Sequence, residues 1–282
     1  MLKKTKLGII AGNRLLPLML AQKIKEKNRD CEVVAFCFKG QTSKRISRYA
    51  DKCYWLSVGA LSDLRKALES QKLSRCIMAG QINPLYIFRK SHWDQELTSL
   101  LSCTGDFRPH AIFGKIINYL EETGVEFLDS TLYLKEDLAK LGVMNGLDLN
   151  KDTAKNIDFG LGVISKFVEL DVGQTIGVKG GSVVALESLE GTDGAIKRVY
   201  RLAGKGCVIL KFCKANQDLR FDVPVVGIAT LKLLKRIGAA ALVLEENKVI
   251  ILERNKFLLL AKKWGIPIVG KSRKTASGLS SI

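Results

Sequence analysis

Three charged residues recur at every second position in the segment QDLRFDVPVVG, residues 217–227. They are Asp218, Arg220 and Asp222. Two lysines, Lys211 and Lys214, stand shortly before them. Carboxylates can bind a metal ion or orient an attacking water molecule, and cations can neutralise the charge of a phosphoryl group. These residue types therefore suit phosphoryl-transfer chemistry.

The spacing of the three charges is that of an extended chain. Val223 precedes Pro224, which biases it toward extended geometry. If the extension reaches back to Asp218, the charged side chains share one face, and the backbones of Asp218 and Asp222 lie roughly 13 Å apart. Two aspartates at that separation do not both bind one metal ion unless the chain bends. An amphipathic edge strand with solvated charges explains the pattern equally well.

A second group of acids precedes a predicted helix in LESLEGTDGAIKR, residues 186–198. Glu187, Glu190 and Asp193 lie within this loop, and so does Thr192. Mg²⁺ takes one or two carboxylates and keeps waters for a phosphate ligand, so Glu190 and Asp193 are candidate ligands. Thr192 and Asp193 are also good helix N-caps, which explains them without a metal.

Small and amide residues follow two predicted strands in the N-terminal half. Gly12 and Asn13 follow the first strand, and Gly80 and Gln81 follow a later one. The carboxyl ends of parallel strands meet at one edge of a sheet, where open α/β sheets bind ligands. The turn at Gly12 lacks the glycine spacing of a dinucleotide fingerprint, which counts against an oxidoreductase. A phosphate cradle and an ordinary tight turn fit it about equally.

The composition restricts the function classes. The formal net charge of +17 attracts nucleic acids, anionic membranes or phosphorylated molecules, and the sequence has no recognisable nucleic-acid-binding motif. The seven cysteines form no CxxC pair, which indicates buried thiols in a reducing compartment. No apolar run approaches the length that crosses a bilayer, and the N-terminus does not read as a signal peptide.

The chain reads as two α/β domains. In the first, strands are predicted at 6–11, 32–38, 53–58, 75–80 and 125–129, with helices at 16–27, 61–70 and 110–124, which favours a parallel sheet. The second has a helix at 152–169, a hairpin at 175–187 and further alternating strands and helices up to 270. We expect domains at 1–145 and 146–270, and a basic, disordered tail at 271–282.

These motifs occur together and in order, and the chain resembles the LpxI-type UDP-2,3-diacylglucosamine pyrophosphatases of lipid A biosynthesis. The resemblance rests on KLGIIAG, AGQINP, LDVGQTIGVKGGSVVALESLEGTDG, VILKFCKANQDLRFDVPVVGIAT and WGIPIVG, and runs from about residue 6 to 270. It implies a Rossmann-like N-terminal domain linked to a C-terminal α/β domain. It also implies a cytoplasmic, Mg²⁺-dependent enzyme at the anionic inner face of the inner membrane. That enzyme hydrolyses UDP-2,3-diacylglucosamine to UMP and 2,3-diacylglucosamine 1-phosphate.

The resemblance assigns roles to particular residues. The functional acid of the QD-R-D motif falls on Asp222 or Asp218, and we favour Asp222, with Arg220 beside it. The substrate-binding residues expected from the matching motifs and the neighbouring cations are Gly12, Asn13, Gly80, Gln81, Gln174, Thr192, Lys211 and Lys214. The expected metal ligands are Asp193, Asp222 and Glu190.

The sequence departs from many relatives at Asn13-Arg14, where they have glycines, and at Arg108 to His110, where they read GDD. These departures bear on the N-terminal substrate contacts more than on the chemistry. A basic nucleic-acid-binding α/β protein without catalytic activity is the alternative, although no nucleic acid is expected as a partner of the enzyme. We also consider a homodimer.

Overall fold

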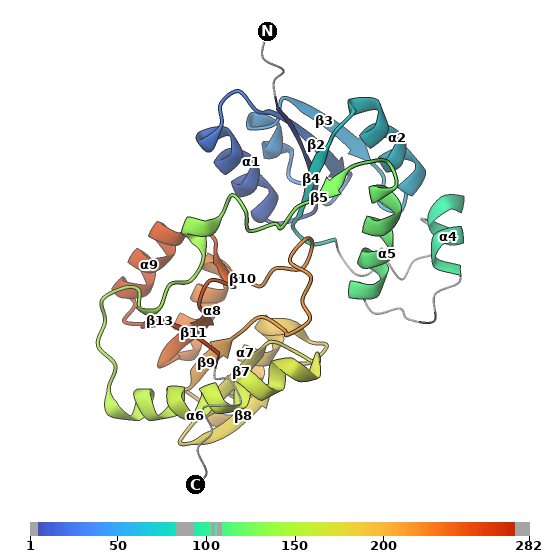
Figure 1. Ribbon diagram of the computed structural model, residues 1–282. Coiled ribbons are helices and arrows are strands. Elements are labelled where there is room, and N and C mark those ends of the chain that lie inside the picture. Colours follow the sequence, from blue (N-terminus) through green and yellow to red (C-terminus); the bar gives the residue numbers. More distant parts are fainter. Residues whose placement is uncertain (1–4, 83–92, 103–104, 106–108, 274–282) are drawn as a thin grey trace. The chain divides into compact units, whose positions relative to one another are not determined.

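A computed structural model describes residues 5–82, 93–102, 105 and 109–273. The chain forms two compact units (Figure 1). The first unit consists of Met1–Leu134 together with Asp218–Asp222, and the second of Lys135–Gln217 together with Val223–Ile282. The division after Leu134 lies before the predicted one at 145, and a short segment of the C-terminal half belongs to the first unit.

The first unit contains a five-stranded parallel sheet with the order β3-β2-β1-β4-β5. This order matches the first five strands of the 3-2-1-4-5-6 order of a doubly wound α/β sheet, and the strand order reverses between β1 and β4. The strands are β1 (Lys6–Ala11), β2 (Glu32–Phe38), β3 (Lys52–Leu56), β4 (Arg75–Ala79) and β5 (Glu126–Phe127). The predicted parallel α/β domain is therefore confirmed.

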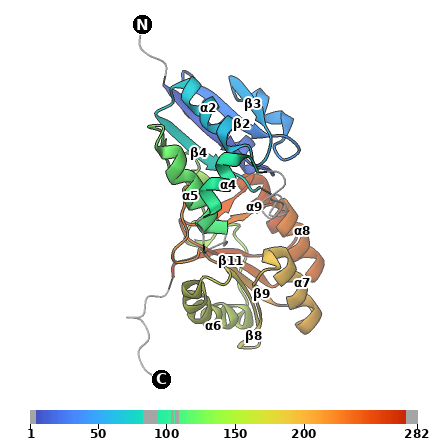
Figure 2. The same ribbon diagram turned by 90° about the vertical axis from the view of Figure 1, so that its right-hand side faces the viewer.

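Helices cover both faces of this sheet, which is why β1, β2 and β4 are almost continuously apolar (Figure 2). Helix α1 (Leu16–Lys27) packs against β1, β2 and β4 on one face. The other face meets α2 (Leu61–Gln71), α4 (Gln95–Ser102) and α5 (Pro109–Glu121) in one apolar cluster. A short 3-10 helix, η1 (Lys44–Arg48), connects β2 to β3.

The second unit is built on a mixed six-stranded sheet with the order β6-β13-β11-β9-β7-β8. Strands β9, β11 and β13 are parallel, and β6, β7 and β8 are antiparallel to their neighbours. Its strands are β6 (Gly142–Val143), β7 (Thr175–Lys179), β8 (Ser182–Leu186), β9 (Val208–Lys211), β11 (Ala241–Glu245) and β13 (Ile268–Lys271). A separate parallel pair joins β10 (Val225–Val226) to β12 (Ile250–Ile251).

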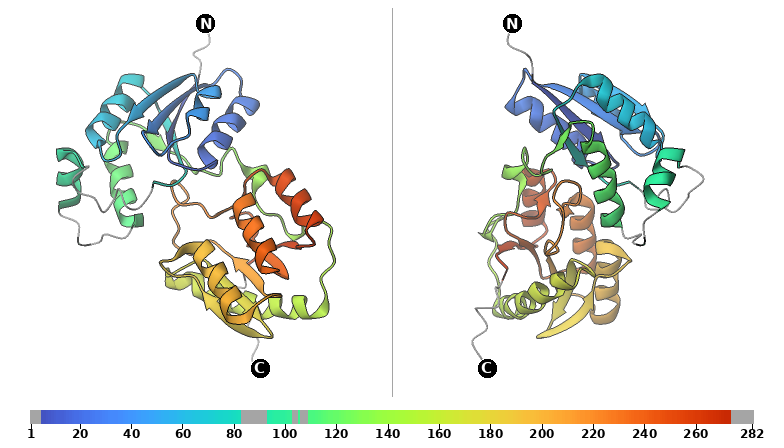
Figure 3. Two further views of the ribbon diagram at one scale, coloured as in Figure 1. Left: turned by 180° about the vertical axis from the view of Figure 1, so that it is seen from behind. Right: turned by 45° about the vertical axis from the view of Figure 1, so that its right-hand side comes forward.

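Two layers of helices enclose the sheet of the second unit (Figure 3). Helix α6 (Lys151–Phe167) packs on one face, and α7 (Gly191–Ala203), α8 (Ile228–Ile237) and α9 (Arg254–Lys263) pack on the other. Short 3-10 helices η3 (Lys135–Asp137) and η4 (Val168–Leu170) complete it. The predicted hairpin forms between β7 and β8 because Gly180 and Gly181 both take positive φ, at 57° and 69°.

The segment at 217–227 is not extended through its three charged residues. The amide of Asp222 donates to the carbonyl of Asp218 (2.9 Å), and the amide of Phe221 donates to the same oxygen (3.2 Å). The chain therefore turns between Asp218 and Asp222, and extension begins only at β10, beyond Pro224. The predicted charged face of an edge strand and the separation of roughly 13 Å are wrong. The restriction imposed by the proline reaches one residue upstream, to Val223, and no further.

The C-terminal tail is ordered at its beginning. Lys271 ends β13, and the guanidinium of Arg273 contacts the buried carboxylate of Glu245 (3.1 Å). The tail prediction is therefore wrong for 271–273, and the rest of the predicted tail, 274–282, lies outside the described residues. Within the described ranges we find no helix both long and apolar enough to cross a membrane.

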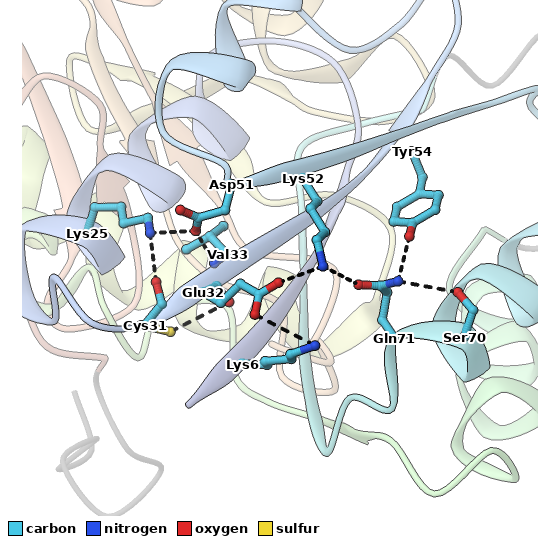
Figure 4. Close-up of polar contacts among 10 residues, drawn as sticks. All are labelled: Lys6, Lys25, Cys31, Glu32, Val33, Asp51, Lys52, Tyr54, Ser70 and Gln71. Carbon is cyan, nitrogen blue, oxygen red and sulfur yellow. Dashed lines mark hydrogen bonds and ion pairs between the residues drawn. The ribbon is translucent and has the colours of Figure 1, made fainter. Parts of the chain in front are cut away.

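A polar network joins the amino ends of β1, β2 and β3, at the sheet edge opposite the strand carboxyl ends (Figure 4). Glu32 contacts Lys6 (3.7 Å) and Lys52 (3.0 Å). The hydrogen bond from Lys52 lowers the pKa of Glu32. Partial burial opposes ionisation of Asp51, but hydrogen bonds from Lys25 and from the Val33 amide outweigh it and lower the pKa of that carboxyl.

These lowered pKa values predict acid sensitivity. The unfolded-state pKa is about 3.9 for Asp and 4.3 for Glu. A carboxyl with a lower pKa in the folded state contributes its full stabilisation at pH values above the unfolded pKa. This stabilisation is lost as the pH falls through the folded-state pKa. We expect Asp51→Asn to reduce the free energy of unfolding at pH 7 and to change it much less at pH 3. Urea unfolding at both pH values checks this. An equal loss at pH 3 and pH 7 would contradict it.

Candidate active site

The loops after β1 and β4 are bonded to each other at the point where the strand order reverses. The amide of Gly12 donates to Ala79 (2.8 Å), and the amide of Asn13 donates to Gln81 (2.7 Å). A Cβ atom on Gly12 would lie 2.6 Å from the Gln81 carbonyl oxygen, and one on Gly80, whose φ is +85°, would lie 2.5 Å from that of Asn13. Glycine is therefore required for this approach. Since these two amides are already bonded, the turn interpretation is favoured over a phosphate cradle at Gly12 and Asn13.

The Asp218–Asp222 turn is held against β4 by one residue. The hydroxyl of Ser130 lies 2.6 Å from the carbonyl oxygen of Met78 and 2.8 Å from that of Arg220. The Ser130 amide also donates to the carbonyl of Leu219 (2.9 Å). Ser130 is buried and follows β5, so it ties the turn to the sheet. Sequence reasoning missed Ser130, because no motif marks it.

The two aspartates of the turn differ in their partners. The Asp218 carboxylate accepts from the Arg220 amide (2.9 Å) and from its guanidinium (2.8 Å). Arg220 also contacts Glu121 of α5 (3.2 Å). Burial opposes ionisation of Asp218, but the Arg220 hydrogen bonds outweigh it and lower its pKa. The same hydrogen bond, donated by the Arg220 guanidinium to Asp218, raises the pKa of Arg220. Asp218 and Arg220 therefore stabilise the turn as an ion pair.

Asp222 is placed differently from Asp218. Its carboxylate has no hydrogen bond or ion pair to the described residues, and it lines a pocket at the carboxyl ends of β1 and β4. The loop residues Gly12, Gly80 and Gln81 line the same pocket, and so does His110 at the start of α5. The structure thus brings four of the predicted site residues together in the first unit. The sequence analysis singled out His110 only because Arg108 to His110 differ from the GDD stretch of many relatives.

Asn13 lies beside this pocket without lining it. Its side-chain amide donates to Gln41 (3.3 Å), and its Oδ1 atom is buried with no hydrogen-bond partner in the described part of the chain. Arg108 and Cys103 belong to stretches outside the described residues.

A buried polar cluster occupies the second unit at the N-terminus of α7. The ammonium of Lys211 donates to the hydroxyl of Thr192 (3.0 Å) and to the carbonyl of Val225 (3.1 Å). The Thr192 hydroxyl lies 3.3 Å from both carboxylate oxygens of Glu187 and 3.3 Å from the hydroxyl of Thr175. Lys211 and Glu187 are 5% and 6% exposed, so two opposite charges are bridged by a hydroxyl inside the unit. The sequence predicted Lys211 and Thr192 as substrate-binding residues, and this remains a prediction.

Two other predicted residues flank this cluster. The backbone carbonyl of Gln174 accepts from the amide of Phe212 (2.9 Å), and its side-chain Oε1 is buried without a hydrogen bond to any described residue. Lys214 pairs with Asp171 (3.1 Å). Gln174 is therefore a candidate for a polar ligand contact.

The predicted metal ligands do not form a cluster within one unit. Asp222 belongs to the first unit, and Glu190 and Asp193 belong to the second. Glu190 is hydrogen-bonded to Arg198 and to the Ser188 amide, and its pKa is lowered, first by the backbone of Glu190 itself and then by Arg198. Across the described ranges no group of three or more His, Cys, Asp and Glu residues is suited to hold a metal. Mg²⁺ prefers oxygen ligands and keeps several waters, and the Asp222 carboxylate is available as one such ligand, whereas that of Glu190 is engaged by Arg198. The metal-binding roles of Asp222, Glu190 and Asp193 stay predictions.

The cysteines lie where the sequence predicted them. Six are described, none of them in a disulfide, and all but Cys53 are buried. Burial raises the pKa of Cys37 and Cys76 to about 12, so these thiols are not nucleophiles.

Family models match both halves of the chain. The LpxI N-terminal domain matches residues 6–137, and the LpxI C-terminal domain matches residues 140–269. The chain belongs to the LpxI family. It is also 27% identical, over 280 residues, to the UDP-2,3-diacylglucosamine pyrophosphatase LpxI of Caulobacter vibrioides, covering 94% of this chain and 97% of that protein. Asp222 belongs by sequence to the LpxI C-terminal domain and by its contacts to the first unit.

Two solved structures are weakly similar to this LpxI chain. The biotin carboxylase domain of a thermophilic 2-oxoglutarate carboxylase is 11% identical, with a TM-score of 0.26, over 61% of this chain and 34% of that one. Phosphoribosylglycinamide synthetase from Anaerococcus prevotii is 12% identical, with a TM-score of 0.26, over 73% and 45%. This chain therefore spans less than half of either structure.

Proposed function

We propose that this LpxI chain hydrolyses the pyrophosphate bond of UDP-2,3-diacylglucosamine, giving UMP and 2,3-diacylglucosamine 1-phosphate in lipid A biosynthesis. The observation that carries the proposal is the Asp222 carboxylate, which has no hydrogen-bond or ion-pair partner among the described residues and lines a pocket between the β1 and β4 loops. Open α/β sheets bind ligands at this position. The relative that matches the chain along almost its whole length is named for this activity.

The reaction needs a water molecule, a proton acceptor and stabilisation of charge. Water attacks one phosphorus atom, the bond from that phosphorus to the bridging oxygen breaks, and the leaving phosphate keeps the electron pair. Asp222 accepts a hydrogen bond from the attacking water and takes its proton. Because Arg220 is engaged with Asp218 and Glu121, it holds the turn that aims Asp222.

We propose Mg²⁺ as the cofactor, with Asp222 as a protein ligand and substrate oxygens and waters completing its coordination. When bound, the ion neutralises charge on the diphosphate. Contact with the anionic leaflet suits the net charge of +17, since the substrate is an anionic lipid. Gln174 and the cations Lys211 and Lys214 remain predicted substrate contacts, and a homodimer remains a prediction.

The direct test incubates the purified chain with UDP-2,3-diacylglucosamine and follows UMP by chromatography. We expect UMP and the lipid phosphate in equal amounts, loss of turnover in EDTA, and recovery when MgCl₂ is added in excess. Turnover that is unaffected by EDTA would overturn the metal proposal. Absence of UMP under every metal condition would overturn the activity.

A further inference from the structure

A buried ion pair lies at the carboxyl ends of the parallel strands in the second unit. Glu245 is the last residue of β11, and Arg273 follows the end of β13. The Glu245 carboxylate is buried and accepts from the Arg273 guanidinium at both of its oxygens, at 3.1 and 3.2 Å. Arg273 lies beyond residue 269, where the match to the LpxI C-terminal domain ends. The cation of this pair is therefore outside the part of the chain that the family model covers.

Both members of the pair also bind the backbone of Cys213, two residues beyond the end of β9. The Cys213 amide donates to the Glu245 carboxylate (2.7 Å), and the Cys213 carbonyl accepts from the Arg273 guanidinium (2.6 Å). Buried backbone groups need such partners once a strand has ended. Glu245 and Arg273 thus close a ring of hydrogen bonds around Cys213, which we call the Cys213 clamp.

The Cys213 clamp holds the beginning of the segment that leads to the Asp218–Asp222 turn. The Gln217 side-chain oxygen accepts from the Lys214 amide (2.9 Å) and lies 3.2 Å from the sulfur of Cys213, so residues 213–217 fold back on themselves. The turn follows at once. Beyond it, the carbonyl of Pro224 accepts from the amide of the first residue of β12 (2.9 Å). The chain therefore enters and leaves the turn from positions that hydrogen bonds fix.

Stability alone does not account for a buried ion pair at this position. Replacing such a pair by apolar groups is often neutral or stabilising, because the cost of desolvation offsets the attraction between the charges. A guanidinium that binds both oxygens of a carboxylate does, however, fix the geometry of the two groups closely. Since both groups also bind Cys213, the pair fixes the conformation of the segment that follows.

We propose that Glu245 and Arg273 are positioning residues for the reaction, which rests on the function proposed above. They hold residues 213–217 in one conformation and so limit the positions open to the Asp222 carboxylate. A displacement of about 1 Å caused by a distant mutation can cost about 10²-fold in rate. Loss of the Cys213 clamp should therefore lower kcat. It should leave KM largely unchanged, because neither residue lines the Asp222 pocket.

The first measurement tests the Cys213 clamp without any turnover. Cys213 and Cys207, which directly precedes β9, are both buried thiols. The full chain is treated with iodoacetamide, and alkylation of each cysteine is followed by peptide mass spectrometry. In Arg273→Gln we expect Cys213 to react about tenfold faster than in the wild type and Cys207 to react as before, because only the clamped segment opens. Lys256→Gln, which breaks an exposed pair with Glu253 in the same unit, is the matched control and should change neither rate.

The second measurement is the steady-state kinetics of UMP release, with thermal melting of each variant. In Arg273→Gln we expect kcat to fall about tenfold or more and KM to change less than about threefold. Arg273→Lys keeps the charge but loses the planar fork, so its kcat should be intermediate. The double variant Glu245→Gln/Arg273→Gln buries no unpaired charge, so its melting temperature should recover. Its kcat should stay low, because the Cys213 carbonyl still lacks the guanidinium donor.

The outcomes separate this inference from the proposed function. Alkylation of Cys213 at the wild-type rate in Arg273→Gln would overturn the Cys213 clamp. Faster alkylation of Cys207 and Cys213 together, or a kcat that recovers with the melting temperature in the double variant, would overturn the positioning role in favour of general stabilisation. Selective alkylation of Cys213 with an unchanged kcat would overturn it as well. If the wild type releases no UMP, the proposed function fails, and selective alkylation of Cys213 would still support the clamp.

Discussion

Asp222→Asn is expected to reduce UMP release by at least ~10²-fold, with the thermal unfolding temperature unchanged. Asparagine has the same size and keeps one oxygen, but it takes no proton and is a weaker ligand for a hard cation. The fold should be retained because the Asp222 carboxylate makes no hydrogen bond or ion pair within the described ranges. The measurement is initial-rate kinetics with circular dichroism melts of the same preparations.

Two control variants sharpen this test. Asp63→Asn changes an exposed carboxylate in the first turn of α2 and should leave the rate unchanged. Asp218→Asn removes the partner of Arg220 and should lower both stability and rate, because the turn that carries Asp222 loosens. A fully active Asp222→Asn enzyme would contradict the assignment. So would a loss of rate that is matched by a loss of folded protein.

Most elements of this fold follow from local sequence patterns. The apolar runs in β1 and β2 and the helical period of α1 and α5 place these elements within a few residues of the observed bounds. The sheet edge at which a ligand is expected to bind also follows from the sequence, because β1 and β4 are parallel and Gly12 and Gly80 lie at their carboxyl ends. These inferences need only the periodicity of the apolar residues along the chain and the parallel direction of the strands.

The turn at Asp218–Asp222 could not be predicted from local spacing. Alternating charges fit a strand, yet the Asp222 amide bonds to the Asp218 carbonyl, and the turn is fixed by Ser130 and Glu121, which lie 90 and 99 residues from Arg220 in the sequence. Long-range contacts of this kind override the strand pattern. They also explain why a segment of the C-terminal half belongs to the first unit.

The burial of Lys211 also could not be predicted from the sequence. Lysine is almost never fully buried unless it is paired, and the pairing here depends on Thr192 of α7 and on Glu187, which directly follows β8. The sequence grouped Lys211 with Lys214 as cations that could neutralise the charge of a diphosphate. The structure separates them, because Lys214 pairs with Asp171 and keeps part of its side chain exposed.

Lys211→Met is expected to lower the free energy of unfolding by about 3 kcal/mol or more. Methionine has similar length and fills the space, but it leaves the Glu187 carboxylate buried without the cation that Thr192 links to it. An uncompensated buried charge is far more costly than a lost surface pair. Urea unfolding at pH 7, followed by circular dichroism, gives the change directly.

The companion variants show whether the cost comes from charge or from packing. Adding Glu187→Gln to Lys211→Met should recover at least about 1 kcal/mol, because the neutral amide no longer needs a cation. Lys214→Met, three residues away, should cost less than about 1 kcal/mol, since its pair with Asp171 is partly exposed. If Lys211→Met is as mild as Lys214→Met, or if the double variant is simply additive, the buried cluster does not depend on its opposite charges. In that case Lys211 would stabilise the second unit through packing and its bond to Val225.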